Sequence, residues 1–255
     1  MVNEPFIDFK GKNVIVTGAS SGIGRAISIQ LNRCGATVVL FGRNQEGLME
    51  TATSLGSGSY HIVKFDLTDH GAIVPKIREV SSNVGRIYGL CHSAGIDEIR
   101  PLSSCKFDRL QLLLDINLLA GIELTRAICR RDIMEEDSGS ILLISSIAGI
   151  VGVPGHVAYS ASKGAVAAAV RTLAIELADR KIKVNAISPG LIRTGMTMKA
   201  LSRLSEQQRQ DIEKAHPLGI GNSKDVARAA TFLLAPQNTW ITGTNMVVDG
   251  GYTAQ

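Results

Sequence analysis

Short apolar runs rich in β-branched residues alternate along the chain with longer segments of helical period. The runs that predict strands are Val14 to Val16, Thr37 to Leu40, His61 to Val63, Ile87 to Cys91, Ile141 to Ile144, Val184 to Ile187 and Met246 to Val248. Helical period is clearest in Gly22 to Arg33, Phe107 to Arg130 and Val157 to Leu177. Strands that are apolar on both faces and alternate with helices indicate a parallel sheet covered on both sides. We therefore expect a doubly wound α/β fold with a seven-stranded parallel sheet.

One domain is expected to cover residues 1–255, because no linker, repeat or low-complexity tract divides the chain. One segment breaks the alternation. Leu191 to Gly221 inserts mostly polar and amphipathic residues before a helix that is predicted to begin near Ser223. A long insertion beside the carboxyl ends of parallel strands is more typical of a substrate lid than of idle surface, so we expect a lid at about residues 191–221.

Composition excludes several classes of protein. The chain is 45% hydrophobic and 20% charged, which is typical of a globular domain and not of a disordered or fibrous one. The formal charge of +4 comes from scattered Lys and Arg, so no nucleic-acid partner is expected. No apolar stretch reaches membrane-spanning length, and the first ten residues carry Glu4 and Asp8 where a signal peptide would be basic and then apolar. We expect no membrane partner and a cytoplasmic protein.

The four cysteines predict no special chemistry. Cys34, Cys91, Cys105 and Cys129 stand far apart and form no C-x-x-C pair. Reduced thiols are therefore expected, and no metal site.

A glycine-rich turn follows the first predicted strand. Thr17 to Gly24 reads T-G-A-S-S-G-I-G and leads into a helix. Such a turn directs free backbone N–H groups and the positive end of the helix dipole at one point, which suits a pyrophosphate. The spacing departs from G-x-G-x-x-G, and an ordinary tight turn is the alternative. The predicted cofactor contacts are Gly18, Ser20, Ser21, Gly22, Ile23 and Gly24.

The end of the second predicted strand bears on the choice of cofactor. An NAD site would place a carboxylate there, whereas this chain has Arg43, followed by Asn44. A guanidinium can bind a 2′-phosphate through paired charge-assisted hydrogen bonds. Arg43 therefore favours NADP(H) over NAD(H). The alternative is that Arg43 is only a solvated residue at a helix start.

A tyrosine and a lysine four residues apart open the predicted helix Val157 to Leu177. On a helix, Tyr159 and Lys163 share a face, and a nearby ammonium is expected to lower the phenol pKa. The second copy of this spacing, Tyr60 and Lys64, lies in a predicted strand and is dismissed. Ser146 follows the fifth predicted strand, at the sheet edge where ligands of such folds bind.

These motifs resemble the short-chain dehydrogenase/reductase family along essentially the whole chain. The glycine motif T-G-x-x-x-G-x-G is met by Thr17 to Gly24, and Y-x-x-x-K by Tyr159 to Lys163. Ser146 stands thirteen residues before the tyrosine, as the family's serine does. The helix asparagine, the P-G turn and the ending are matched by Asn117, Pro189-Gly190 and Val248 to Gly251. The overall pattern looks most like 3-oxoacyl-(acyl carrier protein) reductases.

The resemblance implies a Rossmann fold and a division of roles. Tyr159 would transfer the proton, Ser146 would orient the carbonyl oxygen, Lys163 would hold the cofactor ribose, and Asn117 would position a water. Further implied cofactor contacts are Asn44, Asp66 at the adenine, Leu67, Ala94, Gly95, Tyr159, Lys163, Pro189, Gly190, Ile192 and Thr194 at the carboxamide. Similar enzymes are usually homotetramers, with the helices around Phe107 to Arg130 and Val157 to Leu177 at one interface.

Two departures from the family stand out. Its N-N-A-G is His92-Ser93-Ala94-Gly95 here, and a hydrogen-bonded structural role for His92 is favoured over a catalytic one. Where acyl-carrier reductases carry basic residues, this chain has Glu135-Glu136-Asp137 and Ile175. The acidic turn Glu135-Glu136-Asp137 would repel an acidic carrier protein. A 3-oxoacyl thioester is the leading substrate hypothesis, and a small ketone, a steroid or a ketosugar stays open.

Two other functional classes stay open. An epimerase that keeps its nicotinamide bound would use the same groups, but its relatives usually carry a substrate domain of their own. A non-catalytic cofactor sensor would not need Ser146, Tyr159 and Lys163 together.

Overall fold

The computed structural model describes residues 6–56, 58–202 and 205–255. Glu4 and residues 203–204 of the predicted lid therefore lie outside the described residues. Seven parallel strands form one sheet in the order β3-β2-β1-β4-β5-β6-β9. The strands are β1 (Asn13–Thr17), β2 (Thr37–Gly42), β3 (Tyr60–Lys64), β4 (Gly89–His92), β5 (Gly139–Ile144), β6 (Ile182–Pro189) and β9 (Asn245–Val248). The predicted seven-stranded doubly wound sheet is confirmed.

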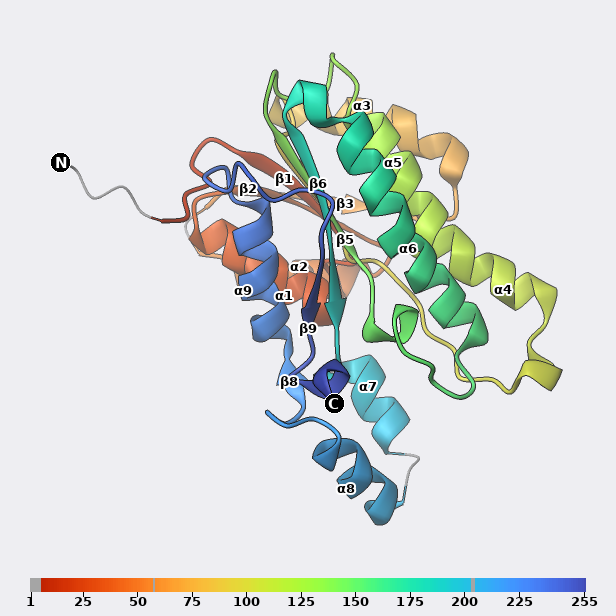
Figure 1. Cartoon of the computed structure of the whole chain (residues 1–255). Helices are drawn as coiled ribbons and strands as arrows, with labels where there is room; N and C mark the ends of the chain where they lie inside the picture. The colour runs from red at the N-terminus through yellow and green to blue at the C-terminus, as the bar shows by residue number, and fades with distance from the viewer. Residues whose placement is uncertain (1–5, 57, 203–204) are drawn as a thin grey trace.

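Helices cover both faces of the sheet (Figure 1). One face carries α1 (Gly22–Arg33), α2 (Gln45–Thr53) and α9 (Ser223–Leu234). The other carries α3 (His70–Val84), α4 (Phe107–Leu114), α5 (Ala120–Ile128) and α6 (Val157–Glu176). Short 3-10 turns span Leu102–Ser104, Ile147–Gly149, Ala178–Arg180 and Tyr252–Ala254.

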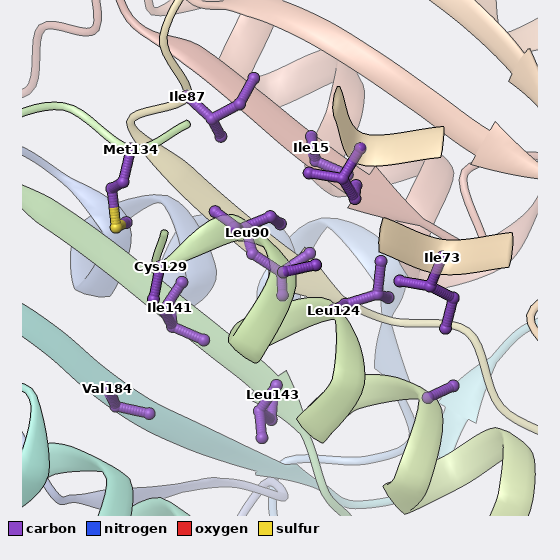
Figure 2. Close-up of a cluster of buried hydrophobic side chains, with 14 of the residues drawn as sticks. Ile15, Ile73, Ile87, Leu90, Leu124, Cys129, Met134, Ile141, Leu143 and Val184 are labelled. Carbon is purple, nitrogen blue, oxygen red and sulfur yellow. The ribbon is translucent and has the colours of Figure 1, made fainter. Parts of the chain in front are cut away.

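Each face of the sheet has its own apolar core. Figure 2 shows the core beneath α3 and α5, where Ile15, Leu90 and Ile141 of three strands meet Leu124 and Ile73 of the two helices. The neighbours of Ile15 in β1, Val14 and Val16, belong to the core on the other face. Successive side chains of a strand point to opposite faces, which explains why these strands are apolar throughout.

The order of the strands sets the position of the site. The chain leaves β1 toward β2 and β3, then returns to place β4 on the other side of β1. In open parallel sheets, ligands bind at such a reversal, in the crevice beyond the carboxyl ends of the strands. The loops after β1 and β4 are therefore the first place to look for a site.

The helix predicted over Phe107 to Arg130 is interrupted. Between α4 and α5 the backbone makes a π-helical turn, Asp115–Leu119, in which the Ala120 N–H donates to the Asp115 carbonyl. The turn buries Ile116 and Asn117. Such turns often occur at functional sites.

The segment predicted as a lid forms two helices beyond the carboxyl ends of the strands. Figure 1 shows α7 (Gly195–Leu201) and α8 (Glu206–Lys214) projecting below the sheet. The two ends of this segment pair as short parallel strands, β7 (Ile192–Arg193) with β8 (Gly221–Asn222).

Three findings on the described residues concern membrane-spanning helices, metal ligands and cysteine thiols. None of its helices is long and apolar enough to cross a membrane, and its residues contain no cluster of metal-ligating side chains. The four cysteines are free thiols. Burial raises the pKa of Cys91 and, to about 11, that of Cys129, which disfavours their thiolates.

Candidate active site

The turn between β1 and α1 is built on close backbone approaches. Gly18 has a φ of +65°, and a Cβ there would lie 2.9 Å from the backbone of Ala94, in the loop after β4. A Cβ at Gly24 would overlap the Gly18 carbonyl. Only glycine fits at both positions, so the turn after β1 lies directly against the loop after β4.

Two side chains that the sequence interpretation missed donate hydrogen bonds to backbone carbonyls of this turn. The Arg25 guanidinium donates to the Ser20 carbonyl at 2.6 Å, and the Thr51 hydroxyl donates to the Ala19 carbonyl at 2.7 Å. Among the described residues, no side chain caps the N-terminus of α1 at Ser21, and its first turn contains no acidic residue. The positive end of this helix is therefore uncompensated, as a phosphate site requires.

The predicted adenosine contacts gather at the ends of β2 and β3. Arg43 Nη1 lies 3.8 Å from Asp66 Oδ2, and the Arg43 side chain is 63% exposed. The pKa of Asp66 is lowered, first by the hydrogen bond from the Thr68 N–H and also by the Arg43 charge. Asn44 accepts from the Gly47 N–H and thereby caps α2. The guanidinium is held near Asp66 and still faces solvent.

His92 joins the ends of β1 and β4. Its Nε2 lies 3.1 Å from the Ile116 carbonyl, which can only accept, so Nε2 carries the proton. Its Nδ1 therefore accepts from the Thr17 hydroxyl at 3.0 Å. Burial and the nearby Lys163 charge lower the pKa of His92 to about 4, so the ring is neutral. The buried ring has both nitrogens engaged, as a structural histidine would.

Asn117 lies at the centre of the π-helical turn and is fully buried. Its side chain accepts from the Ile96 N–H at 2.9 Å and donates to the Ile96 carbonyl at 3.0 Å. Its second amide hydrogen goes to the Ser162 hydroxyl at 3.0 Å. A Cβ at Gly95 would lie 3.1 Å from Asn117 Oδ1 and 3.4 Å from Lys163 Nζ, so glycine leaves room for both groups. The Asn117 amide fixes the loop after β4 and one face of α6.

Tyr159 and Lys163 lie on the first turns of α6, beside Ser146. Lys163 Nζ donates to the Ile144 carbonyl at the end of β5, at 2.7 Å, and lies 5.8 Å from the centre of the Tyr159 ring. Ser146 precedes the 3-10 turn Ile147–Gly149, and its hydroxyl accepts from the Ala148 N–H. The end of β5 and the start of α6 thus bring a phenol, an ammonium and a hydroxyl together.

The remaining predicted contacts are spread along the same edge. Thr194 Cγ2 would lie 3.4 Å from a Cβ at Gly22, so the segment after β6 reaches the glycine turn. The Thr194 hydroxyl accepts from the Thr197 N–H in α7. Pro189 ends β6, and the Gly190 N–H donates to β9. Leu67 and Ile192 are buried in the two apolar cores.

Comparison with known proteins agrees with this geometry. The family described as enoyl-(acyl carrier protein) reductase matches residues 18–253. A 3-oxoacyl-[acyl-carrier-protein] reductase of Rickettsia bellii is 34% identical over 246 residues, which cover 96% of this chain and 98% of the relative. The chain belongs to the short-chain dehydrogenase/reductase family. It is therefore an oxidoreductase of the CH–OH class, in a family that uses a nicotinamide cofactor.

Other members of the short-chain dehydrogenase/reductase family are equally similar. A glucose 1-dehydrogenase of Gluconobacter oxydans is 34% identical over 254 residues, covering 98% of this chain and 95% of the relative. A solved structure from Beutenbergia cavernae, provisionally assigned as an NAD(P)-dependent gluconate 5-dehydrogenase, holds NADP at low occupancy. It is 33% identical, with a TM-score of 0.90, and covers 99% of this chain and 100% of its own.

In this short-chain dehydrogenase/reductase, the expectation that Lys163 lowers the pKa of Tyr159 is wrong. Burial, together with the charge of Asp97, raises the pKa of Tyr159 to about 12, against a smaller lowering by the Ser146 hydroxyl. Burial lowers the pKa of Lys163 itself to about 8. The positive charge of Lys163 can be read from the sequence, but the burial of Tyr159 cannot. Loss of hydration on burial disfavours the phenolate and determines the direction of the Tyr159 pKa shift.

Asp97 and His156 also lie at this site, and the sequence interpretation missed both. His156 stands at the N-terminal boundary of α6, three residues before Tyr159, and its Nε2 lies 3.5 Å from Asp97 Oδ2. The dismissed pair, Tyr60 and Lys64, occupies the two ends of β3, as expected.

Proposed function

We propose that this protein interconverts a carbonyl compound and a secondary alcohol with NADP(H). The observation that carries the proposal is the placement of Tyr159 and Lys163 of α6 beside Ser146, at the carboxyl end of β5. This placement puts an acid–base group at the same edge of the sheet as the glycine turn after β1. A reaction at this edge can therefore combine a dinucleotide and a small organic molecule.

The residues along this edge of the sheet fit a dinucleotide. Gly18 and Gly24 keep the turn free of side chains, and the uncompensated start of α1 suits the pyrophosphate. Lys163 and Thr194 would hold the nicotinamide half, and Ala94, Gly95 and Ile192 would line its path. When bound, the nicotinamide supplies a hydride to the substrate carbon or accepts one from it.

Tyr159 is suited to donate the proton in reduction. A pKa of about 12 keeps the phenol protonated at neutral pH, so it can pass its proton to the substrate oxygen as the carbon gains the hydride. The C=O double bond then becomes H–C–OH. Ser146 would donate a hydrogen bond to the same oxygen, and the buried Lys163 ammonium would stabilise the phenolate that remains. Alcohol oxidation runs the same steps in reverse.

The Asn117 side chain has a positioning role beside the water-binding role that the family resemblance implies for this residue. Its two amide hydrogens and its carbonyl oxygen are engaged by Ile96 and Ser162. We propose that the side chain positions the loop after β4 and α6, and that a water at this residue would be held by groups other than the side-chain amide.

NADP(H) is the proposed cofactor because of Arg43. Its exposed guanidinium lies at the end of β2, and Ser20 Oγ would lie 3.5 Å from a Cβ at the preceding Gly42. A 2′-phosphate at this position would find a cation and a hydroxyl together. The NADP held by the Beutenbergia relative supports this choice.

Two substrate classes find support among the relatives. The acyl-carrier reductase of Rickettsia favours a 3-oxoacyl thioester, and the glucose and gluconate dehydrogenases favour a sugar-derived alcohol or ketone. The acidic turn Glu135-Glu136-Asp137 should repel an acidic carrier protein less than expected, because two of its charges are paired. Lys12 pairs with Glu135 at 2.6 Å and Arg86 pairs with Glu136 at 3.2 Å, at the amino-terminal end of the sheet.

We also propose the lid and the assembly that the family resemblance implies. α7 and α8 would close over the substrate from beyond the strand ends. A homotetramer would cover exposed apolar side chains on the helices α4 to α6, among them Phe107, Leu119 and Val157.

NADPH oxidation with a panel of ketones, coenzyme thioesters and carrier-protein thioesters tests the proposal. We expect stoichiometric loss of NADPH absorbance with at least one carbonyl class. Substrate conversion without net loss of NADPH would point to an epimerase, and binding of NADPH without any turnover would point to a sensor.

A further inference from the structure

Asp97 and His156 form a charged pair directly beside Tyr159. Asp97 follows β4 and His156 precedes α6, and Asp97 Oδ2 lies 3.5 Å from His156 Nε2. The imidazole ring packs edge-on against the Tyr159 ring, with centroids 6.0 Å apart and planes at 63°. The pair therefore faces the phenol that the proposed reaction uses.

The two loops that carry this pair are tied to the scaffold and to each other. Asn117 holds both backbone groups of Ile96, the residue before Asp97. The Arg100 N–H donates to the Gly155 carbonyl, next to His156, at 2.8 Å. Asp97 is thus positioned before any substrate arrives, which lowers the entropic cost of a contact with it.

Both ring nitrogens of His156 face acceptors. Nδ1 lies 3.1 Å from the Pro154 carbonyl, which can only accept, so Nδ1 donates. Nε2 faces the Asp97 carboxylate, and this contact raises the pKa of His156. The imidazole orients the carboxylate, and in its protonated form it partly offsets the carboxylate charge.

The Asp97 carboxylate keeps acceptor capacity that the protein does not use. In the described part of the chain, His156 is the only group that pairs with it. The adjacent Glu98 differs, because Arg100 and Arg109 bind its two oxygens at 2.6 and 3.1 Å. The Asp97 side chain is 27% exposed. Burial raises the pKa of Tyr159 and lowers that of Lys163, and the Asp97 charge adds to the first shift and opposes the second.

We propose that Asp97, oriented by His156, accepts hydrogen bonds from hydroxyl groups next to the reacting carbon, so that the substrate is a polyhydroxylated ketone or alcohol. This assignment rests on the proposed carbonyl–alcohol function. A 3-oxoacyl thioester has only acceptor oxygens near its ketone. It would desolvate the carboxylate without supplying a donor, which is costly.

Matched ketones test this assignment on the unmodified protein. The pairs are dihydroxyacetone with acetone and 2-hydroxycyclohexanone with cyclohexanone, with acetoacetyl-coenzyme A as the thioester. We expect kcat/KM with NADPH to be roughly 10- to 100-fold higher for the hydroxylated member of each pair, the value of a hydrogen bond to a charged group. Equal values within both pairs, or a preference for the thioester, would overturn the assignment.

Variants separate recognition from an effect on Tyr159. Asp97→Asn should lower kcat/KM more for the hydroxylated ketones than for acetone and cyclohexanone, so that the preference within each pair is lost. Glu98→Gln, which removes the same charge one residue away, should preserve the preference for hydroxylated ketones. An equal loss of kcat/KM for both members of each pair in Asp97→Asn would show that Asp97 does not read hydroxyl groups.

The proposed function can fail separately. If NADPH binds, as measured by its fluorescence, but no ketone or thioester of the panel is reduced and no polyol is oxidised, carbonyl–alcohol chemistry itself is wrong. If ketones are reduced without regard to their hydroxyl groups, the proposed function stands and only the role of Asp97 falls.

Discussion

Thr17 Oγ1 lies 3.0 Å from His92 Nδ1, and this contact joins the carboxyl ends of the neighbouring strands β1 and β4. The same Thr17 oxygen accepts from the N–H groups of Ser93 and Ala94, at 3.1 and 3.0 Å. Thr17 therefore holds the start of the loop after β4, whereas Asn117 holds the loop at Ile96. His92 replaces the first of the family's paired asparagines. An imidazole is larger than an amide, and the room for it comes from Gly121.

Replacing Gly121 with Ala should destabilise the protein, although Gly to Ala within a helix ordinarily stabilises. A Cβ at Gly121 would lie 2.8 Å from His92 Cδ2. We expect a loss of about 1–3 kcal/mol in the free energy of unfolding, as for other overpacked sites. Urea denaturation measures it.

A double-mutant cycle provides the control. In a His92→Asn background the smaller side chain removes the clash, and Gly121→Ala should then stabilise by about 0.5–1 kcal/mol. The same change in unfolding free energy in both backgrounds would show that Gly121 does not accommodate the His92 ring.

Arg43 should determine the choice between the two dinucleotides. Arg43→Ala is expected to weaken NADPH binding by roughly 10- to 100-fold, because a charge-assisted hydrogen bond to the 2′-phosphate is lost, while NADH binding changes little. Arg43→Asp should invert the preference. Fluorescence titration of each variant with both cofactors gives the ratio, and an unchanged ratio would remove Arg43 from the account.

Lys163 should make stability depend on pH. Its pKa is about 8 in the folded protein, below the ordinary 10.5 of a lysine, because burial disfavours the ammonium. From about pH 8 upward the folded state loses this proton before the unfolded state does, so stability rises with pH. Relative to Lys163→Met, the wild-type protein should gain roughly 2–3 kcal/mol of unfolding free energy between about pH 7 and pH 10.

Urea denaturation of both proteins across this range checks the prediction. Taking the difference between them cancels other titrating groups, including Lys183, whose pKa burial also lowers to about 8. A difference that stays constant with pH would mean that Lys163 is not buried as a charge.

The sequence predicted the sheet and the positions of the main site residues, because both depend on local patterns. Short apolar runs located the seven strands. The predicted secondary structure distinguished Tyr159 and Lys163 on a helix from Tyr60 and Lys64 on a strand. The π-helical turn at Asn117 was not predicted, since the Leu-rich pattern from Phe107 continues through it without a break.

The missed residues act through contacts between distant segments. Asp97 and His156 lie in different loops, and only the fold brings their side chains to 3.5 Å. Arg25 looks like an ordinary helix residue, yet it binds the Ser20 carbonyl. The raised pKa of Tyr159 depends on burial, which local spacing does not reveal.

The central claim is that the Tyr159 phenol transfers the proton that accompanies hydride transfer. The most direct test is kcat of Tyr159→Phe for the best ketone of the panel, alongside its Kd for NADPH. We predict that kcat falls by about 10²- to 10⁴-fold, the usual contribution of a general acid, while Kd is nearly unchanged. A Tyr159→Phe variant that reduces the ketone at the wild-type rate would contradict the account.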